Sequence, residues 1–563
     1  MTRLLVSLLL LLPLPAHAAD PPDPGELLGK TAPLGLVEAI QLALHNNLGL
    51  TISRTAPEVA HEELEQARGV FDPIGFAEYR FEHSEIPIAN AVQSAFGGGA
   101  NIDTDEWNYS GGFNGILPVG MSYGSTYNFR RTDTDSAFTG LEPENRASVT
   151  SELVLPLLRD LIHNEANVTV KRSRIAEAIS QDEFRRDLTD FVLLVESSYW
   201  ELAASGAGVE VAQKSLKTAN DLLEQTRIRH EVGVVSRVDV TQAEAGVAER
   251  EFAAITAGNR AGRAQDTLLN LVVVPSHAGF ATTHLVPEEP TYVEYTVNEE
   301  VSVARAMRHR PELAAARRTV EDAELQLAFA ENQRLPRLDL VASYTVNGLS
   351  GTQKRNAGTL PPRASSCVDA NLDGVCDAAP VLDTCSVDPL TGQCSRVSDL
   401  GLSSGGSSSH SDFFRGSGDK GWVIGGRVEI PFGNRSARHL AFQREIELRR
   451  TRTALRRTEQ TVILDVRNSS RVLRNALQAL QAAERRVVAQ EETLRAEQER
   501  LRLGDSTPFT VLEFEEDLAE AEQQEIFALQ TYRNAIAALE RAQGTLLETR
   551  NISVEQELGR QPL

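Results

Sequence analysis

The sequence predicts a mixed α+β protein in which a tandem duplication carries long coiled-coil helices and β-strands in each half. Three observations indicate this fold class. The second half of the chain repeats the first, apolar residues recur at coiled-coil spacing over long segments, and shorter segments alternate apolar and polar residues. The composition agrees, because 41% hydrophobic and 24% charged residues are ordinary for a folded chain of 563 residues.

The N-terminus has the form of a secretory signal peptide. Arg3 precedes an apolar run from Leu4 to Leu12, and Ala16-His17-Ala18 has the small-x-small pattern of a cleavage site. The run is shorter than the roughly 20 residues of a membrane-spanning helix. We therefore expect residues 1–18 to be removed and the mature chain to start at Ala19 without a lipid anchor, since no cysteine follows the cleavage site.

The duplication is visible as two ungapped alignments of the chain with itself. Leu36–Phe81 aligns with Glu299–Tyr344, and the segment from Gly233 aligns with the segment from Gly504. Each half has the same order of elements: helix, strands, long helix, turn, long helix. After the signal peptide, the predicted organisation is a first repeat (19–278), an inter-repeat linker (279–298), a second repeat (299–548) with an inserted loop (348–420), and a C-terminal tail (549–563).

The long helices give the strongest periodic signal. From Leu188 to Leu223 apolar and small residues advance by alternate steps of three and four, and from Val466 to Leu501 they recur every seven residues. Leu518 to Leu546 follows the same rule. The pattern from Leu158 to Glu231 contains no proline, so it predicts one helix on the order of 100 Å long.

Six segments have the two-residue period of strands. They lie near Ile74, Trp107, Met121 and Ala147 in the first half, and over Leu338–Val346 and Trp422–Ile430 in the second. One face is apolar and aromatic, which fits either the core of a soluble sandwich or the lipid-facing side of a membrane barrel. The helices leave too few strands for a closed β domain in each subunit. A barrel shared among identical subunits is therefore favoured.

Together these features resemble the TolC-like family of bacterial outer-membrane efflux proteins. The residues that carry the resemblance are the opening helix Leu36–Ala43, its copy ending in Arg310-Pro311-Glu312-Leu313, the Pro156-Leu-Leu-Arg159 junction, and the turns at Gly233 and Gly504. The resemblance covers nearly the whole mature chain. Two departures stand out. Leu48 occupies the place of Pro311 in the first repeat, and the first half has four strand-like segments where the family pattern has two.

The resemblance implies a homotrimer in a Gram-negative bacterium. Its strands would form one shared outer-membrane β-barrel, continued by an α-helical tunnel across the periplasm. Partners would be a periplasmic adaptor protein and an inner-membrane pump, in a tripartite efflux or type I secretion system that exports drugs, metals, small solutes or proteins. The resemblance also implies that the two turns lie at the periplasmic end, where the tunnel narrows and the adaptor docks.

The turn residues have a structural and a functional interpretation. Gly233 and Gly504 fit helix C-caps, and Ser236 and Thr507 fit the N-caps of the following helices. The functional interpretation is that these small exposed residues form a docking notch. Both interpretations can hold together.

Two acidic residues follow the turns. The resemblance implies that Asp239 and Glu513 form a carboxylate ring in the trimer, which would favour cations. Thr510 stands at the position that aligns with Asp239. The alternative is that these carboxylates interact with a helix dipole or are solvated surface groups.

The inserted loop carries all the cysteines. In an oxidising compartment Cys367, Cys376, Cys385 and Cys394 predict two disulfides, with three pairings open. Within the loop, Asp369, Asn371, Asp373, Val375 and Asp377 resemble the start of a calcium loop, with Gly374 at the turn, although Pro380 stands where a full EF-hand has Glu. The alternative is a solvated acidic loop held only by disulfides.

Other function classes lack sequence support. A net charge of −23 disfavours nucleic-acid binding, and the 11 histidines show no metal spacing. We find no catalytic set, no Gly-x-Ser-x-Gly and no P-loop, so an enzyme is not expected. The alternative function is a periplasmic coiled-coil adaptor or a surface adhesin without a pore. Detergent would distinguish them, because a channel should require it and an adaptor should not.

Overall fold

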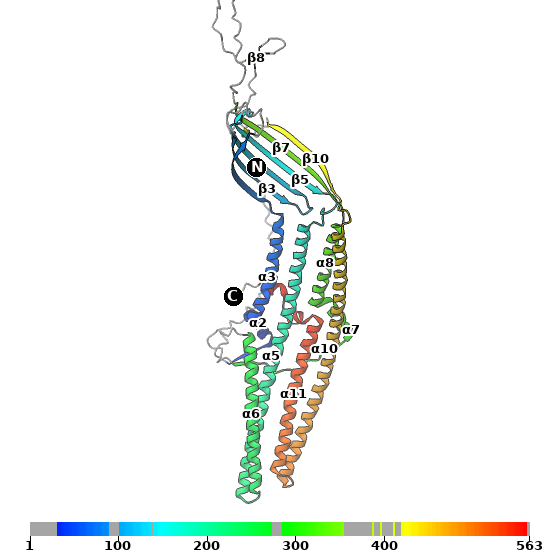
Figure 1. Ribbon diagram of the computed structural model, residues 1–563. Helices are drawn as coiled ribbons and strands as arrows, with labels where there is room; N and C mark the ends of the chain where they lie inside the picture. Colours follow the sequence, from blue (N-terminus) through cyan, green and yellow to red (C-terminus); the bar gives the residue numbers. More distant parts are fainter. Residues whose placement is uncertain are drawn as a thin grey trace, which may run out of the picture. The chain divides into compact units, whose positions relative to one another are not determined.

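The computed structural model describes residues 31–88, 101–136, 139–272, 284–353, 385–387, 394–396, 409–410 and 418–559. The fold is mixed α+β, as the sequence predicts, with long helices and one large antiparallel sheet (Figure 1). Contacts divide the chain into two compact units. One includes Ser173–Glu324 and the other Leu64–Arg172 and Leu325–Glu445, so each unit takes segments from both sequence repeats. The repeat boundaries themselves stay a prediction.

The helices occupy most of the described chain. In chain order they are α2 (Leu36–Asn46), α3 (Leu48–Arg68), α5 (Glu165–Glu231), α6 (Arg237–Val272), α7 (Glu299–His309), α8 (Pro311–Asn332), α10 (Arg435–Leu503), α11 (Pro508–Gln543), α12 (Leu546–Thr549) and α13 (Val554–Leu558). A short 3₁₀ helix, η1 (Gly69–Phe71), follows α3. Two short strands, β1 (Thr31–Leu34) and β6 (His284–Pro287), pair in parallel.

The long helices form two antiparallel hairpins, α5–α6 and α10–α11 (Figure 1). Ion pairs join the helices of each hairpin: Arg260 lies 2.9 Å from Glu201 in the first, and Arg486 lies 3.2 Å from Glu520 in the second. The helix predicted from Leu158 begins seven residues later, at Glu165. Its predicted start is wrong because Asp160 adopts a left-handed backbone conformation, with φ of 68°.

The predicted coiled-coil seams are the buried faces of these helices. Leu188, Val195 and Leu202 belong to a large apolar cluster that also contains Tyr199, which has no exposed surface. The Tyr199 hydroxyl donates to the carbonyl of Leu34 at 2.9 Å and accepts from the backbone amide of Glu288 at 2.8 Å. The tyrosine ring is thus buried while its hydroxyl keeps hydrogen-bond partners.

Tyr532 has the corresponding place on α11. It is fully buried with Leu473 and Leu480 of α10, and its hydroxyl donates to the carbonyl of Val293 at 2.7 Å. In each hairpin, therefore, one tyrosine fastens a long helix to an extended segment.

Over the described ranges the large sheet contains six strands. They are β2 (Ile74–Pro87), β3 (Asn101–Ile116), β4 (Ser122–Thr134), β5 (Leu141–Pro156), β7 (Arg337–Gln353) and β10 (Asp419–Glu429), in the spatial order β10-β7-β5-β4-β3-β2. All neighbours are antiparallel. The six predicted strand segments are thus all present, and all in one sheet.

The predicted insert is shorter than its proposed bounds at both ends, because β7 continues to Gln353 and β10 begins at Asp419. Between them the structure describes a small hairpin, β8 (Cys385–Val387) paired with β9 (Cys394–Arg396), and residues 409–410.

A junction of polar contacts joins α7, α8, α10 and α11. Arg310, 6% exposed at the side chain, separates α7 from α8, and its Nη1 lies 2.9 Å from Asp465 of α10. The same nitrogen donates to the carbonyl of Arg541 near the end of α11. Asp465 also accepts from Arg541, whose Nε donates to Asp190 of α5 at 2.8 Å. Arg310 is the first residue of the Arg-Pro-Glu-Leu motif found in the sequence.

Candidate functional site

The two turns between the long helices have the same backbone geometry. Gly233 and Gly504 have φ of +80° and +88°, a region that glycine enters without the steric cost of a side chain. After each glycine the next residue bonds back across the turn: Val234 N–H donates to Arg229, and Asp505 N–H donates to Arg500, both at 2.9 Å. Both helices therefore end in the glycine C-cap that the sequence predicts.

The residues after each glycine begin the next helix. Ser236 and Asp239 cap α6 reciprocally: the Asp239 carboxylate accepts from the Ser236 amide at 2.7 Å and from its hydroxyl at 2.8 Å. Because both groups stabilise the charged form, they hold the pKa of Asp239 below its usual value. At α11, Thr507 is the N-cap and its hydroxyl accepts from the Thr510 amide at 3.3 Å. The capping roles are confirmed at both turns.

The two predicted constriction residues differ in their surroundings. The Asp239 carboxylate is engaged by Ser236, whereas Glu513 lies exposed on the first turns of α11. Their role in a ring stays a prediction, because it requires neighbouring subunits.

The structure adds a contact between the two hairpins that the sequence did not indicate. Arg250 of α6 is 6% exposed, and its Nη2 donates to the carbonyl of Leu512 on α11 at 2.7 Å. Its Nη1 donates to the carbonyl of Gly246 at 3.1 Å. Leu512 packs with Ala219 of α5 in a small apolar cluster. No local signal marks this arginine, because it stands between charged neighbours in the sequence and resembles any solvated helix position.

Glu515 is the most perturbed acid near the turns. It is 8% exposed on α11, and burial raises its pKa to about 7 against the attraction of Arg250 and a hydrogen bond from Gln498. Its repeat counterpart Glu244 is exposed and pairs with Arg227 at 2.8 Å. Equivalent positions of the two repeats thus hold a buried carboxyl group, Glu515, and an exposed one, Glu244.

This difference predicts a pH effect on stability. A carboxyl whose pKa is raised in the folded state contributes stability at low pH, which is lost as pH rises from about 4.5 to about 7. Replacing Glu515 by glutamine should remove this loss. We expect the variant to differ little from the parent at pH 5 and to exceed it by about 3 kcal/mol at pH 8.

The measurement is thermal unfolding in detergent across this pH range, followed by circular dichroism. The matched control is Glu244→Gln, which should change stability little and equally at every pH, because the side chain is exposed. A Glu515→Gln variant that keeps the parent's pH dependence would contradict the burial argument.

The sheet has two chemically distinct faces. Side chains of directly paired residues share a face, so the register assigns each position. The apolar face includes Tyr79, Phe81, Trp107, Tyr109, Tyr127, Phe129, Val149, Tyr344, Val346, Trp422 and Ile424. The polar face includes Glu78, Arg80, Asn108, Ser110, Thr126, Asn128, Ser148, Thr150, Ser343 and Thr345. Both faces continue across all six strands.

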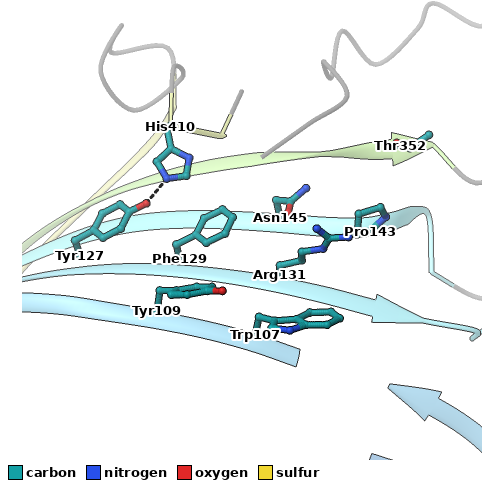
Figure 2. A pocket seen from close by; sticks show the side chains of 9 residues that line it. All are labelled: Trp107, Tyr109, Tyr127, Phe129, Arg131, Pro143, Asn145, Thr352 and His410. Atoms are coloured by element: carbon teal, nitrogen blue, oxygen red, sulfur yellow. Dashed lines mark hydrogen bonds between the residues drawn. The ribbon is translucent and has the colours of Figure 1, made fainter. Parts of the chain in front are cut away.

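An aromatic recess lies on the apolar face. In Figure 2, Trp107 and Tyr109 project from β3, Phe129 projects from β4, and His410 lies beside Tyr127. The Tyr127 hydroxyl and His410 Nε2 are 2.5 Å apart. Arg131 lies over the Trp107 ring, 5.4 Å from its centroid. Aromatic rings with an accompanying cation are typical of a membrane–water interface.

Most residues of the predicted disulfides and calcium loop lie outside the described residues, so calcium binding and disulfide formation stay predictions. The residues outside are Cys367, Cys376, Asp369, Asn371, Asp373, Val375 and Asp377. Cys385 and Cys394 begin β8 and β9, where the register sets Cys385 opposite Arg396. Among the residues that the structure describes, no group of three or more His, Cys, Asp or Glu side chains could hold a metal ion.

Over the same described part of the chain, none of the helices combines the length and apolar character needed to cross a membrane.

Comparison with known proteins decides the family. The sequence profile of the outer membrane efflux protein family matches residues 120–272 and 398–545, more than half of the chain. The chain belongs to the outer membrane efflux protein family. Membership places the protein in the outer membrane, extending into the periplasm, and classes it with channel proteins that serve efflux. No curated protein matches the chain.

Solved structures of outer-membrane channels share the fold. The CmeC outer membrane channel of Campylobacter jejuni aligns with a TM-score of 0.59 and 14% identity, over 93% of this chain and 89% of that one. The outer membrane protein VceC of Vibrio cholerae aligns at 0.56 and 15%, over 90% and 96%. The open state of the MtrE outer membrane channel of Neisseria gonorrhoeae aligns at 0.55 and 15%, over 91% and 89%. At these identities the likeness concerns the fold.

Proposed function

We propose that three copies of the chain assemble into the outer-membrane exit duct of a tripartite efflux system, with a periplasmic adaptor and an inner-membrane pump as partners. The observation that carries the proposal is the continuous sheet with one apolar and one polar face. Outer-membrane barrels face lipid with apolar and aromatic side chains and line their interior with polar ones. Closure of the strands satisfies every backbone group within the bilayer.

The long hairpins supply the periplasmic part of the duct. Each ends in a glycine turn followed by a capped helix, so each subunit offers two similar projecting ends, at Gly233–Ser236 and Gly504–Thr507. The residues at these ends are small and largely exposed. We propose that they form the adaptor-docking sites, two per subunit.

The decisive experiment is single-channel conductance of the detergent-extracted protein in a planar bilayer, with its oligomeric mass determined in the same preparation. The exit-duct proposal predicts stable pores and the mass of three chains. A soluble particle that needs no detergent and forms no pores would instead support the adaptor or adhesin function.

Charge selectivity tests the proposed carboxylate ring. Replacing Asp239 by asparagine and Glu513 by glutamine should lower the preference for cations over anions severalfold, because a ring of three carboxylates in a narrow pore attracts cations. The measurement is the reversal potential across the bilayer under a salt gradient. Glu251→Gln is the control, since this exposed residue of α6 lies about 18 Å along the helix from Asp239. Unchanged selectivity in both ring variants would contradict the ring.

A further inference from the structure

The described sheet indicates how many strands each chain contributes to the proposed barrel. Its six strands form one continuous antiparallel ladder with no break between the first half and the second: Val149 of β5 pairs with Val346 of β7. The β2–β3 pairing is as extensive as the others, from Ile74↔Asn114 to Pro87↔Asn101. The additional hairpin of the first half is therefore an integral part of the sheet.

The sheet ends in two long edges. Among the described residues, β2 and β10 each pair on one side only, which leaves edges of 14 and 11 residues. A long uncovered edge exposes a row of backbone donors and acceptors and pairs readily with another strand. Because six antiparallel strands alternate in direction, β2 and β10 run oppositely. The edge β2 of one chain can thus pair with β10 of another in antiparallel fashion.

We infer that each chain contributes all six strands to the shared barrel, so that β2 of one subunit pairs with β10 of the next and three subunits close a barrel of eighteen strands. This inference rests on the proposed trimer. The occupant of each free edge is a second copy of this chain.

The stagger of the strands agrees with such a closure. Following direct partners across the sheet leads from Ile74, the first residue of β2, to Val423 of β10. Val423 lies six residues before Glu429, the last residue of β10. If Ile74 pairs with Glu429 of the neighbouring subunit, the pairing shifts by six residues, or about 20 Å along the strands, over the six strands of one subunit, which are about 29 Å wide. The resulting tilt of about 35° is that of outer-membrane barrels.

The same register matches the faces of the two edges. Pairing Ile74 with Glu429 brings Tyr79 opposite Ile424 and Phe81 opposite Trp422, all on the apolar face. These four side chains are between 49% and 73% exposed in the isolated chain. Cross-strand aromatic and β-branched pairs of this kind stabilise a sheet.

The inferred barrel is wide. At this tilt and strand spacing, eighteen strands give a backbone diameter of about 34 Å, compared with about 22 Å for twelve. Barrels of this strand number leave an open aqueous channel.

Cysteine cross-linking of the full-length protein tests the pairing. Arg80→Cys with Val423→Cys places one thiol on each edge at positions that the register sets opposite, both on the polar face and both exposed. We expect a covalent trimer on non-reducing gels that returns to monomer with reductant. The parent chain and the two single variants control for its own cysteines.

A second pair tests closure without the β2–β3 hairpin. If only four strands per chain formed the barrel, aligned ends of β4 and β10 would set Asn128 opposite Val423, so Asn128→Cys with Val423→Cys would yield the covalent trimer. That result would overturn the inference, as would pores from a trimer in which neither pair cross-links. A mass other than three chains would overturn the proposed function itself. Counting strands in a single-particle reconstruction provides the independent measurement, and the expected number is eighteen.

Discussion

Replacing Arg310 by alanine is expected to destabilise the helical unit by about 3 kcal/mol, because the change removes a buried guanidinium together with its packing and its hydrogen bonds to a partly exposed carboxylate and to helix carbonyls. The Arg310 guanidinium, 6% exposed, holds Asp465 at 2.9 Å and contacts a carbonyl near the C-terminus of α11. Without it, Asp465 keeps Arg541 as its ion-pair partner among the described residues, and carbonyls at the negative end of the helix dipole lose a cation.

The midpoint of thermal unfolding at a fixed scan rate measures this effect. Arg452→Ala provides the matched control, since Arg452 pairs with Glu324 at 2.7 Å but both side chains are more than half exposed. Exposed pairs contribute at most about 1 kcal/mol. Equal shifts in the two variants would show that the Arg310 network contributes no more than a surface ion pair.

Replacing Gly544 by alanine is expected to cost about 3 kcal/mol, for two separable reasons. Gly544 has φ of +76° and ends α11, donating its N–H to Arg541 at 3.0 Å. A Cβ here would lie 2.9 Å from the carbonyl carbon of His309 and 3.1 Å from the amide nitrogen of Arg310. Both are backbone atoms, so the clash cannot be relieved by a rotamer change.

The two turn glycines separate the causes. Gly233 and Gly504 share the positive φ, but a Cβ at either would meet nothing within 4 Å. Their alanine variants should therefore show only the conformational cost of about 1–2 kcal/mol. Thermal unfolding of the three variants gives the comparison. If Gly544→Ala behaves like the other two, the close approach of α11 to the α7–α8 junction is not rigid in solution.

The strands and long helices could be predicted because their signals are periodic. Alternation near Ile74, Trp107, Met121 and Ala147 identified four strands of the first half, and the three-and-four spacing identified α5. The start of α5 could not be predicted, since the left-handed Asp160 depends on its contacts with the chain around it. Gln333 bonds its carboxylate and Asn332 its amide.

The turns could be predicted because their signals are local in sequence, but the contacts around the turns could not. Glycine caps and the Ser236–Asp239 pair are encoded within a few residues. Arg250 and Glu515 lie on different hairpins, and their burial arises only when α6 packs on α11. The role of Arg310 in the Arg-Pro-Glu-Leu motif could not be predicted either, because its ion-pair partner Asp465 lies far along the chain.

The order of strands in the sheet also constrains how the protein is made. β2 to β5 are consecutive in sequence and can pair as soon as they enter the periplasm, but β5 finds its second neighbour only in β7, where Leu155 pairs with Leu340. Such distant pairing makes folding slow, because a long loop must close before the contact forms. The edge of β5 therefore remains uncovered while α5 and α6 emerge. We expect periplasmic chaperones to be needed during this interval, since an uncovered strand edge is also the surface on which chains aggregate.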